Sequence, residues 1–377
     1  MTDTSKRIGT AGAAAMVAAG IVYGAYYIKA PGDDCPVWTC GANSAQVIGY
    51  AMQLDGEPNS DGYRITGFES RDEGGRSIRY TFDDKNAGFV GEHGQVGKLD
   101  VADSRFVIRG AENTIKPGEQ LSKLVFERKG KKKYDITIND VQTVQSWAQP
   151  AGREPRLITS YLFESHLPGS TARKLCDKQS RWAAPDETPH ITERATQKWH
   201  RGSFHAVLVA GDTYDTTRVR VNPGERWVDI ACAGSALAKM KLLGYDPEVP
   251  AGDPLYTTRE QRQTTLKMIT ATYCEAPQGQ RFTENGTPLA WLDTRGLFMP
   301  PWDLVQGVEA RWNESGATCL SDPRLLTRDR VTKICGELPL CPERVVPPAA
   351  TSSYPLDGNE WASFKRREPS PDVLAKN

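Results

Sequence analysis

The chain has 377 residues, of which 38% are hydrophobic and 25% are charged, a balance typical of a soluble globular body rather than a membrane-embedded one. Its 47 basic and 47 acidic residues give a formal net charge of zero. No overall positive field therefore attracts nucleic acid, and we expect no nucleic-acid partner. The length accommodates two or three domains, or one large one.

The first predicted element is an apolar run over residues 8–28, which contains no charged residue and follows Lys6 and Arg7. It is long enough to cross a bilayer, and the preceding positive charges place the N-terminus in the cytoplasm. A cleaved signal peptide is the alternative, but Pro31 directly follows the best small-residue cleavage site and should hinder cleavage. We therefore predict that residues 1–29 hold a single transmembrane helix whose membrane partner is the bilayer around residues 8–28.

All eight cysteines follow this run: Cys35, Cys40, Cys176, Cys232, Cys274, Cys319, Cys335 and Cys341. Export into an oxidising space favours disulfides, and the absence of any C-x-x-C pair argues against a zinc ribbon or a thioredoxin-type redox pair. We predict a disulfide framework with no metal and no cofactor. The pairing that we favour is Cys35–Cys40 within a linker over residues 30–44, then Cys176–Cys232, Cys274–Cys319 and Cys335–Cys341.

Residues 45–165 are predicted to form a β-rich domain. Short segments rich in β-branched and aromatic residues alternate with turn pairs such as Asp61-Gly62. The clearest of these segments are Gln46–Gln53, Tyr63–Phe68, Ser77–Phe82 and Phe106–Arg109.

A predicted β-hairpin follows, with strands at Leu124–Lys129 and Lys133–Ile138. Its tip carries five basic residues: Arg128, Lys129, Lys131, Lys132 and Lys133. One interpretation is a patch that binds an anionic polymer or lipid, and it predicts salt-sensitive association that Lys→Glu changes abolish. The interpretation that we favour is a solvated tip whose charges prevent edge-to-edge strand pairing.

Residues 166–346 are predicted to form a second, disulfide-stapled unit, and the Pro- and Ser-rich residues 347–377 a flexible tail. Four further strands are predicted at Ile158–Phe163, Phe204–Ala210, Thr217–Val221 and Trp227–Ala231, and three short helices at Ser235–Leu243, Thr257–Tyr273 and Thr327–Cys335. Thr257 and Glu260 have the spacing of a capping box. The predicted fold class is α+β, with a strand-rich N-terminal part followed by a unit in which short helices pack on strands.

We find no recognisable catalytic motif in the sequence. The serine-hydrolase motif G-x-S-x-G is absent, and Ser235 is better explained as the residue that starts a helix. Cys274 would need a basic partner to act as a nucleophile, and none of the five histidines is selected by the local sequence. The close carboxylates Asp212 and Asp215 are interpreted as turn formers.

One stretch resembles a known family. The strings WVDIACAGSALAKMKLLGY from Trp227, TTLKMITATYCEAP, RFTENGTPLAWLD and VEARWNESGATCLSDPRL are similar to the ADYC domain of secreted or envelope-attached bacterial proteins. The motif that names the family is here Ala-Thr-Tyr-Cys, with Thr272 in place of aspartate. Cysteines of the family pattern are replaced by Met240 and Thr265, which the resemblance implies face each other on two helices. It implies an extracytoplasmic domain and no established activity.

The sequence leads us to expect an extracytoplasmic module that binds a partner or serves a structural role, either anchored in the cell membrane or secreted. An envelope protein or an anionic polymer would be its partner. The alternative is a cell-envelope hydrolase or transferase whose active site is assembled from distant residues. A pocket holding His200 or His205 beside Cys274, Asp212 or Asp215 would favour the enzyme. An exposed apolar patch with fully paired cysteines would favour the binding module.

Overall fold

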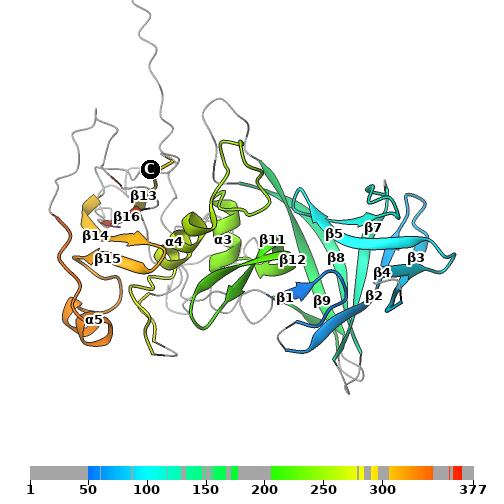
Figure 1. Cartoon of the computed structure of the whole chain (residues 1–377), viewed down its shortest axis with the longest axis horizontal. Helices are drawn as coiled ribbons and strands as arrows, with labels where there is room; N and C mark the ends of the chain where they lie inside the picture. The colour runs from blue at the N-terminus through cyan, green and yellow to red at the C-terminus, as the bar shows by residue number, and fades with distance from the viewer. Residues whose placement is uncertain are drawn as a thin grey trace, which may run out of the picture.

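The computed structural model describes residues 50–366 with gaps, the longest of which are 177–204, 284–289, 296–304 and 343–355. Figure 1 shows three layers along the long axis: a large sheet, a middle layer with helices α3 and α4, and a small sheet flanked by α5. The strand-rich part of the predicted fold class, with its short helices and disulfides, is confirmed.

The predicted membrane helix over residues 8–28 and the predicted disulfide Cys35–Cys40 lie outside the described residues. Within the described part of the chain, no helix is both long and apolar enough to cross a membrane.

The large sheet is antiparallel throughout and has the strand order β1-β12-β11-β9-β8-β7-β2-β3-β4-β5-β6, with the short β10 paired to β9. Its strands are β1 (Tyr50–Gln53), β2 (Tyr63–Arg71), β3 (Ser77–Asp83), β4 (Gly88–Gly91), β5 (Val96–Ala102), β6 (Arg105–Arg109), β7 (Gln120–Arg128), β8 (Tyr134–Gln145), β9 (Leu157–His166), β10 (Arg173–Lys174), β11 (His205–Asp215) and β12 (Arg220–Cys232). The predicted hairpin is confirmed as β7 and β8. The sheet crosses the domain boundary expected at residue 165, because β9, β11 and β12 continue it.

The large sheet curls back on itself. Its last strand, β6, reaches β9 in the middle of the strand order, where the Phe106 amide donates to the Tyr161 hydroxyl at 3.0 Å. The concave side is filled by large buried side chains from most strands. Phe68, for example, stacks on Tyr80 at a ring separation of 4.5 Å. The curled sheet therefore encloses a hydrophobic core packed with aromatic rings.

The base of the β11–β12 hairpin, residues 205–209 and 228–232, is buried on both faces. Ala206 and Leu208 of β11 point into the core of the curled sheet, whereas Val207 and Val209 pack against the helix layer. Strands covered on both faces are expected to be almost continuously apolar, and the run from His205 to Ala210 fits that rule. The hairpin therefore joins the two main cores of the molecule.

The three predicted helices are confirmed as α3 (Ala236–Leu242), α4 (Arg259–Ile269) and α5 (Arg328–Cys335). Ser235 is the N-cap of α3, as expected, and its hydroxyl accepts from the Ala238 amide. The capping box of α4 is shifted by one residue from the prediction, to Thr258 and Gln261. The shift frees the Thr257 carbonyl to accept from the Arg262 guanidinium at 2.6 Å.

The small sheet has the order β13-β16-β14-β15 and is formed by β13 (Ala290–Leu292), β14 (Val305–Asn313), β15 (Gly316–Leu320) and β16 (Trp361–Arg366). Strand β16 corrects the prediction of a flexible tail over residues 347–377. Its Trp361, Ala362, Ser363 and Phe364 are all buried. Burial of two aromatic rings outweighs the Pro- and Ser-rich character of the flanking sequence, which is what suggested a tail.

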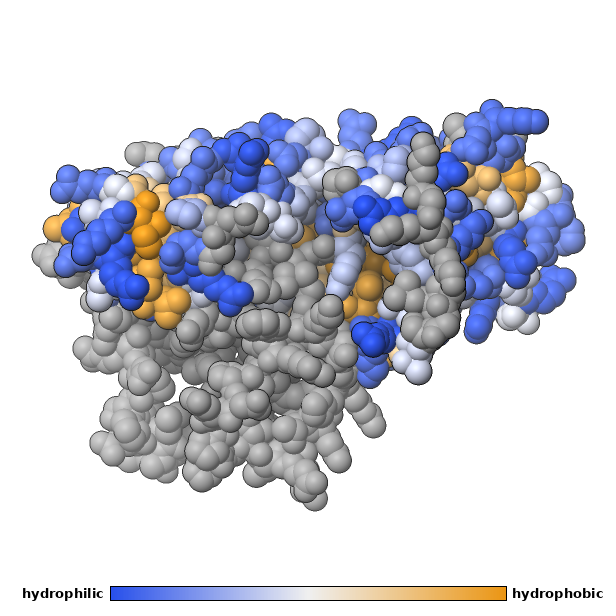
Figure 2. Space-filling model, turned by 90° about the horizontal axis from the view of Figure 1, so that it is seen from below, coloured by the Kyte–Doolittle hydropathy of each residue, from blue (hydrophilic) through white to orange (hydrophobic). Residues whose placement is uncertain are grey.

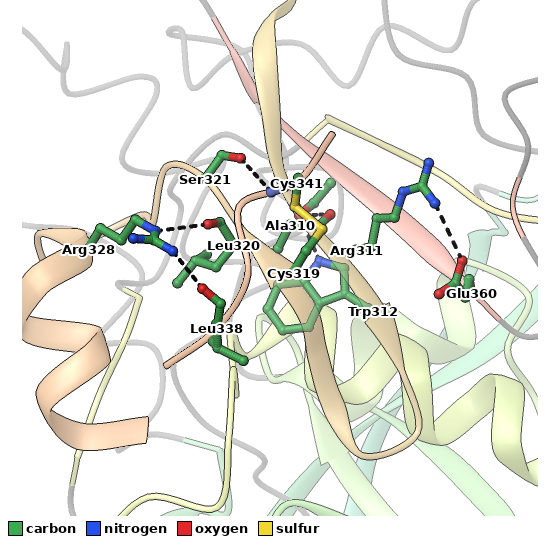
Figure 3. Close-up of a disulfide and its surroundings, with 11 residues drawn as sticks. Ala310, Arg311, Trp312, Cys319, Leu320, Ser321, Arg328, Leu338, Cys341 and Glu360 are labelled. Atoms are coloured by element: carbon green, nitrogen blue, oxygen red, sulfur yellow. Dashed lines mark hydrogen bonds and ion pairs between the residues drawn. A yellow bond between two sulfur atoms is a disulfide. The ribbon is translucent and has the colours of Figure 1, made fainter. Parts of the chain in front are cut away.

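Three disulfides join the six cysteines that the structure describes. Cys176–Cys232 is confirmed, whereas the predicted Cys274–Cys319 and Cys335–Cys341 are wrong and are replaced by Cys274–Cys335 and Cys319–Cys341. The prediction joined cysteines close in sequence. After α5, however, the chain returns beside β15, where the Leu320 amide donates to the Pro339 carbonyl. The Cys341 amide also donates to the Ser321 hydroxyl, at 3.1 Å (Figure 3). That return brings Cys341 to Cys319 and leaves Cys335 at the helix end for Cys274.

The pairing makes a direct prediction. Peptide mapping of the unreduced chain should yield linked fragments for Cys274–Cys335 and Cys319–Cys341. The double variant Cys274→Ser/Cys335→Ser should lose about 4 kcal/mol of unfolding free energy in urea, and Cys319→Ser/Cys341→Ser about 3 kcal/mol, since the chain-entropy model scales the effect with loop length. A linked fragment joining Cys274 to Cys319 would contradict the fold described here.

Candidate functional site

The strongest concentration of buried charge lies between the β11–β12 hairpin and the helix layer. We name it the buried charge cluster, and its members are Arg156, Asp212, Asp229, Lys241, Asp246, Glu248 and Arg262. Buried charges are costly unless they are paired, so each member needs a partner or a changed protonation state.

A β-bulge places Asp212 in this cluster. The β11–β12 register shifts between Ala210 and Gly211, and Gly211 has φ +100°, a conformation that favours glycine. Before the bulge, odd-numbered residues such as Val209 face the helices, whereas after it Tyr214 does so. The residues unpaired with β11, 225–227, lie on β12, and on β11 the unusual Gly211 conformation is where the alternation changes, so that the Asp212 side chain faces α4.

Arg262 of α4 holds Asp212 with two hydrogen bonds, of 2.6 Å and 3.1 Å. Burial raises the pKa of the Asp212 carboxyl, and the Arg262 guanidinium opposes that shift. Asp212 was expected to form a turn, and this expectation is wrong. Asp215 does form one, since its carboxylate accepts from the amides of Thr217 and Arg218.

A second group of charges lies at the end of α3. The Lys241 side chain is fully buried and its ammonium is 3.0 Å from Asp246 and 2.5 Å from Glu248. Arg156, just before β9, adds a second cation to Asp246 at 3.0 Å. Burial raises the pKa of Glu248, and Lys241 opposes the shift.

Asp229 is the member of the cluster without a counterion. It is 2% exposed, and within the described part of the chain its Oδ2 has no hydrogen-bond partner. The buried Tyr214 hydroxyl likewise has none. Burial, reinforced by the charge of Asp212, raises the pKa of Asp229 to about 7. The three cations of the cluster balance three of its four carboxylates, so the cluster is neutral when Asp229 carries a proton.

The Ala-Thr-Tyr-Cys segment lies at a second polar centre. The Tyr273 hydroxyl donates to Glu309 at 2.7 Å, and Arg324 donates from Nε to both Glu309 oxygens, at 2.7 Å and 2.9 Å. The Tyr273 ring stacks on Trp312 at 5.1 Å, and the neighbouring Cys274 is in a disulfide. Tyr273 and Cys274 therefore fasten the end of α4 to the small sheet and to α5.

A serine, a histidine and an aspartate meet on the outer face of the large sheet. Ser160 Oγ lies 3.3 Å from His205 Nδ1, and His205 Nε2 lies 3.6 Å from Asp140. Ser160 and His205 are buried, and the Ser160 hydroxyl also bonds the Gln142 carbonyl at 3.3 Å. Burial lowers the pKa of His205, and the Asp140 charge opposes this. The sequence had singled out His205, but not these two neighbours.

The other predicted site residues are dispersed. Arg128 lies over the Tyr63 ring at 5.3 Å and Lys133 is 3.6 Å from Glu127, whereas Lys129, Lys131, Lys132 and His200 lie outside the described residues.

Met240 and Thr265 are buried on helices that contact each other, and their predicted close approach stays a prediction. No group of three potential metal ligands gathers within the described ranges.

An apolar patch surrounds α5. Leu325 and Leu340 are exposed by 42% and 65%, with the half-buried Leu326 and Leu338 beside them in the chain. We name these four residues the α5 patch. Figure 2 shows apolar surface at the end of the molecule that holds α5 and β15, between hydrophilic side chains. Arg328 fixes the segment by donating to the carbonyls of Leu320 and Leu338 (Figure 3).

Comparison with known proteins gives one match. The sequence model of a family described as the ADYC domain matches residues 118–326, which is more than half of the chain. No curated protein and no solved structure matches the chain. The matched residues include the buried charge cluster and the Ala-Thr-Tyr-Cys motif.

The protonated state of Asp229 predicts a specific pH dependence. A folded-state pKa of about 7, above the ordinary 3.8, means that the folded chain holds this proton more tightly than the unfolded chain. Its contribution to stability is full below about pH 4 and is lost as the pH rises through 7, by about 4 kcal/mol in total. About 3 kcal/mol of this total is lost between pH 5 and pH 8. Urea unfolding at these two pH values should show that loss in the wild-type chain and a much smaller one in Asp229→Asn. Equal losses in both chains would refute the assignment.

Proposed function

The chain belongs to the ADYC domain family, and we propose that it is an extracytoplasmic binding or structural module that contacts its partner through the α5 patch. We further propose that residues 8–28 anchor it in the cell membrane with its body in the periplasm or the exterior, or that it is secreted when this segment is cleaved.

The disulfides support the location. They indicate an oxidising compartment, since the cytosol keeps thiols reduced. Two of the three, Cys274–Cys335 and Cys319–Cys341, hold the α5 unit. The anchor rests on the charge and hydropathy of the N-terminal segment.

The α5 patch is the observation that carries the binding role. Two large leucines with about half of their area exposed, set on a disulfide-stapled unit, are typical of a protein contact rather than of a solvated surface. Rigid attachment lowers the ordering cost of binding. The partner that fits best is an envelope protein with an apolar surface, whereas an anionic polymer would instead use the basic hairpin tip between β7 and β8.

Site-specific photocrosslinking in cells tests this role. A photoreactive phenylalanine analogue at Leu340 should give discrete crosslinked products in the exported chain, because that side chain lies in the proposed contact. The same analogue at the exposed Asp329, on the polar side of α5, is the matched control and should give none. Identical products from both positions, or none from Leu340, would refute the proposed contact.

The second candidate is a hydrolase that uses Ser160, and the Ser160–His205–Asp140 arrangement favours it. It requires an accessible hydroxyl whose proton passes to an imidazole. Ser160 is instead 1% exposed and bonds the Gln142 carbonyl, which suits a structural link between β8 and β9.

A fluorophosphonate probe separates these two roles. We expect no covalent labelling of the wild-type chain, and the same unfolding midpoint in the presence and absence of probe, because Ser160 is buried. Labelling of the wild-type chain that Ser160→Ala abolishes would establish the hydrolase. Ser165→Ala, on the same strand and half-exposed, is the matched control.

A further inference from the structure

One of the described disulfides can be reached by another thiol while the chain stays folded. We propose that Cys274–Cys335 is a thiol–disulfide exchange site for an external dithiol, and that its reduction releases the C-terminal end of α5 from the rest of the molecule. The inference goes beyond the proposed function and does not depend on what the α5 patch binds.

The three described disulfides differ in burial. Both cysteines of Cys176–Cys232 are 0% exposed, and both cysteines of Cys319–Cys341 are 5% exposed. The cysteines of Cys274–Cys335 are instead partly exposed, although they pack against the main core. Exchange begins when a thiolate attacks one sulfur of the bond, so its rate depends on access to that sulfur. Cys274–Cys335 is therefore the one of these three bonds that a dithiol can approach in the folded chain.

Both ends of this bond lie outside the strand ladders. Cys335 is the last residue of α5, at the end of the molecule opposite the large sheet (Figure 1), and the exposed residues 336–337 follow it. Cys274 comes after α4 has ended and directly precedes the exposed Glu275. Each of the other two bonds has one cysteine within a strand, β12 or β15. A dithiol can therefore approach Cys274–Cys335 without separating paired strands.

The charges beside Cys274 favour its departure as a thiolate. Its neighbour Glu275 pairs with Arg220. This pairing lowers the pKa of the Glu275 carboxyl, and the charges of Lys267 and Arg218 lower it further. With the one further carboxylate that acts on Lys267, this group holds three cations and two carboxylates among the described residues. Positive charge lowers the pKa of a nearby thiol, and a thiol of lower pKa is the better leaving group.

The other sulfur has the opposite surroundings. Cys335 ends α5, and the unpaired carbonyls of a last helical turn carry partial negative charge, which disfavours a thiolate there. We therefore assign Cys335 as the sulfur that is attacked and Cys274 as the sulfur that leaves.

The exchange is balanced between the two partners. A thiolate of the dithiol attacks Sγ of Cys335, the sulfur–sulfur bond breaks, and Cys274 leaves as a thiolate that takes a proton from water. The second thiol of the dithiol loses its proton and attacks the mixed disulfide, which frees Cys335 as a thiolate that is protonated in turn. The dithiol is oxidised to a disulfide, and the chain gains two electrons as two thiols. Because the second thiol resolves the mixed disulfide, a dithiol is the class of partner that fits.

Reduction frees one end of α5 and leaves its start attached. Within its own eight residues α5 buries only Val331, and a helix of this length is not stable by itself. Cys319–Cys341 still holds the segment after the helix to β15. Arg328 still donates to the carbonyls of Leu320 and Leu338. We therefore expect the end of α5 to open locally while the rest of the fold persists.

Limited reduction tests the exchange site. The oxidised full-length chain is incubated with dithiothreitol under native conditions and quenched with acid. Free thiols are alkylated with light iodoacetamide and, after complete reduction, the remaining ones with heavy iodoacetamide, so that peptide mapping reports each cysteine separately. We expect Cys274 and Cys335 to become reduced together, at least about ten times faster than the cysteines of the other two described bonds, because the fold shields those from attack.

The same chain in urea is the matched control. There we expect the three bonds to be reduced at similar rates, because unfolding exposes all of them. Under native conditions, reduction of Cys176–Cys232 or Cys319–Cys341 as fast as that of Cys274–Cys335, or faster, would overturn the proposal. A preference for Cys274–Cys335 that persists unchanged in urea would also overturn it, since such a preference would not come from the fold.

Hydrogen exchange measures the release of α5. In the chain reduced and alkylated only at Cys274–Cys335, we expect the amides of residues 332–335 to exchange at least about tenfold faster than in the oxidised chain, and those of α3 to stay unchanged. The variant Cys274→Ser/Cys335→Ser should reproduce this pattern without alkylation. Unchanged protection of α5, or an equal loss of protection in α3, would show that the bond does not hold α5 locally and would overturn the proposed release.

Discussion

The base of the β11–β12 hairpin carries the constraint on which the rest of the molecule depends, because it is buried on both faces. One face closes the aromatic core of the curled sheet and the other supports the helix layer, so a shift of its register by one residue would exchange the side chains that the two cores are packed around. The pairing register shifts beside Gly211, so the apolar half of the hairpin and the half that carries Asp212 pair in different registers. Gln263 of α4 fixes the end of the hairpin by bonding the Val219 carbonyl and the Val221 amide.

The buried charges contribute specificity more than stability. Removing ions from water costs several kcal/mol for each ion, and even well-paired buried ions roughly offset that cost. The Arg262–Asp212 pair instead restricts how α4 can lie on the hairpin. Any other orientation would separate the two groups and leave each as a buried, unpaired charge. Asp229 has no such partner, and burial raises its pKa to about 7, which favours the neutral form of this carboxyl. The cluster therefore fixes how the hairpin and the helix layer are aligned.

The sequence predicted local structure well and remote contacts poorly. Apolar alternation located the strands and hairpin, Ser235 located the start of α3, and the long Cys176–Cys232 loop was paired correctly. Asp212 was misjudged because its role depends on Arg262, fifty residues away, although Gly211 just before it was a signal for a bulge. The residues of the α5 patch and β16 were missed for the same reason, since their surroundings come from segments distant in sequence.

The small sheet shows why two disulfides and a C-terminal strand gather at one end of the chain. Among the described residues its outer face buries only Leu292, Ala362 and Phe364, whereas its inner face adds Trp291, Trp312 and Trp361 to the main core. Strand β16 is an inner strand of this sheet, because it pairs with β13 on one side and with β14 on the other. Its Trp361 therefore adds to the core a buried ring from outside the family match. Cys274–Cys335 and Cys319–Cys341 fix α5 and the segment after it to this sheet, so the exposed Leu325 and Leu340 can stay on the surface without weakening the core.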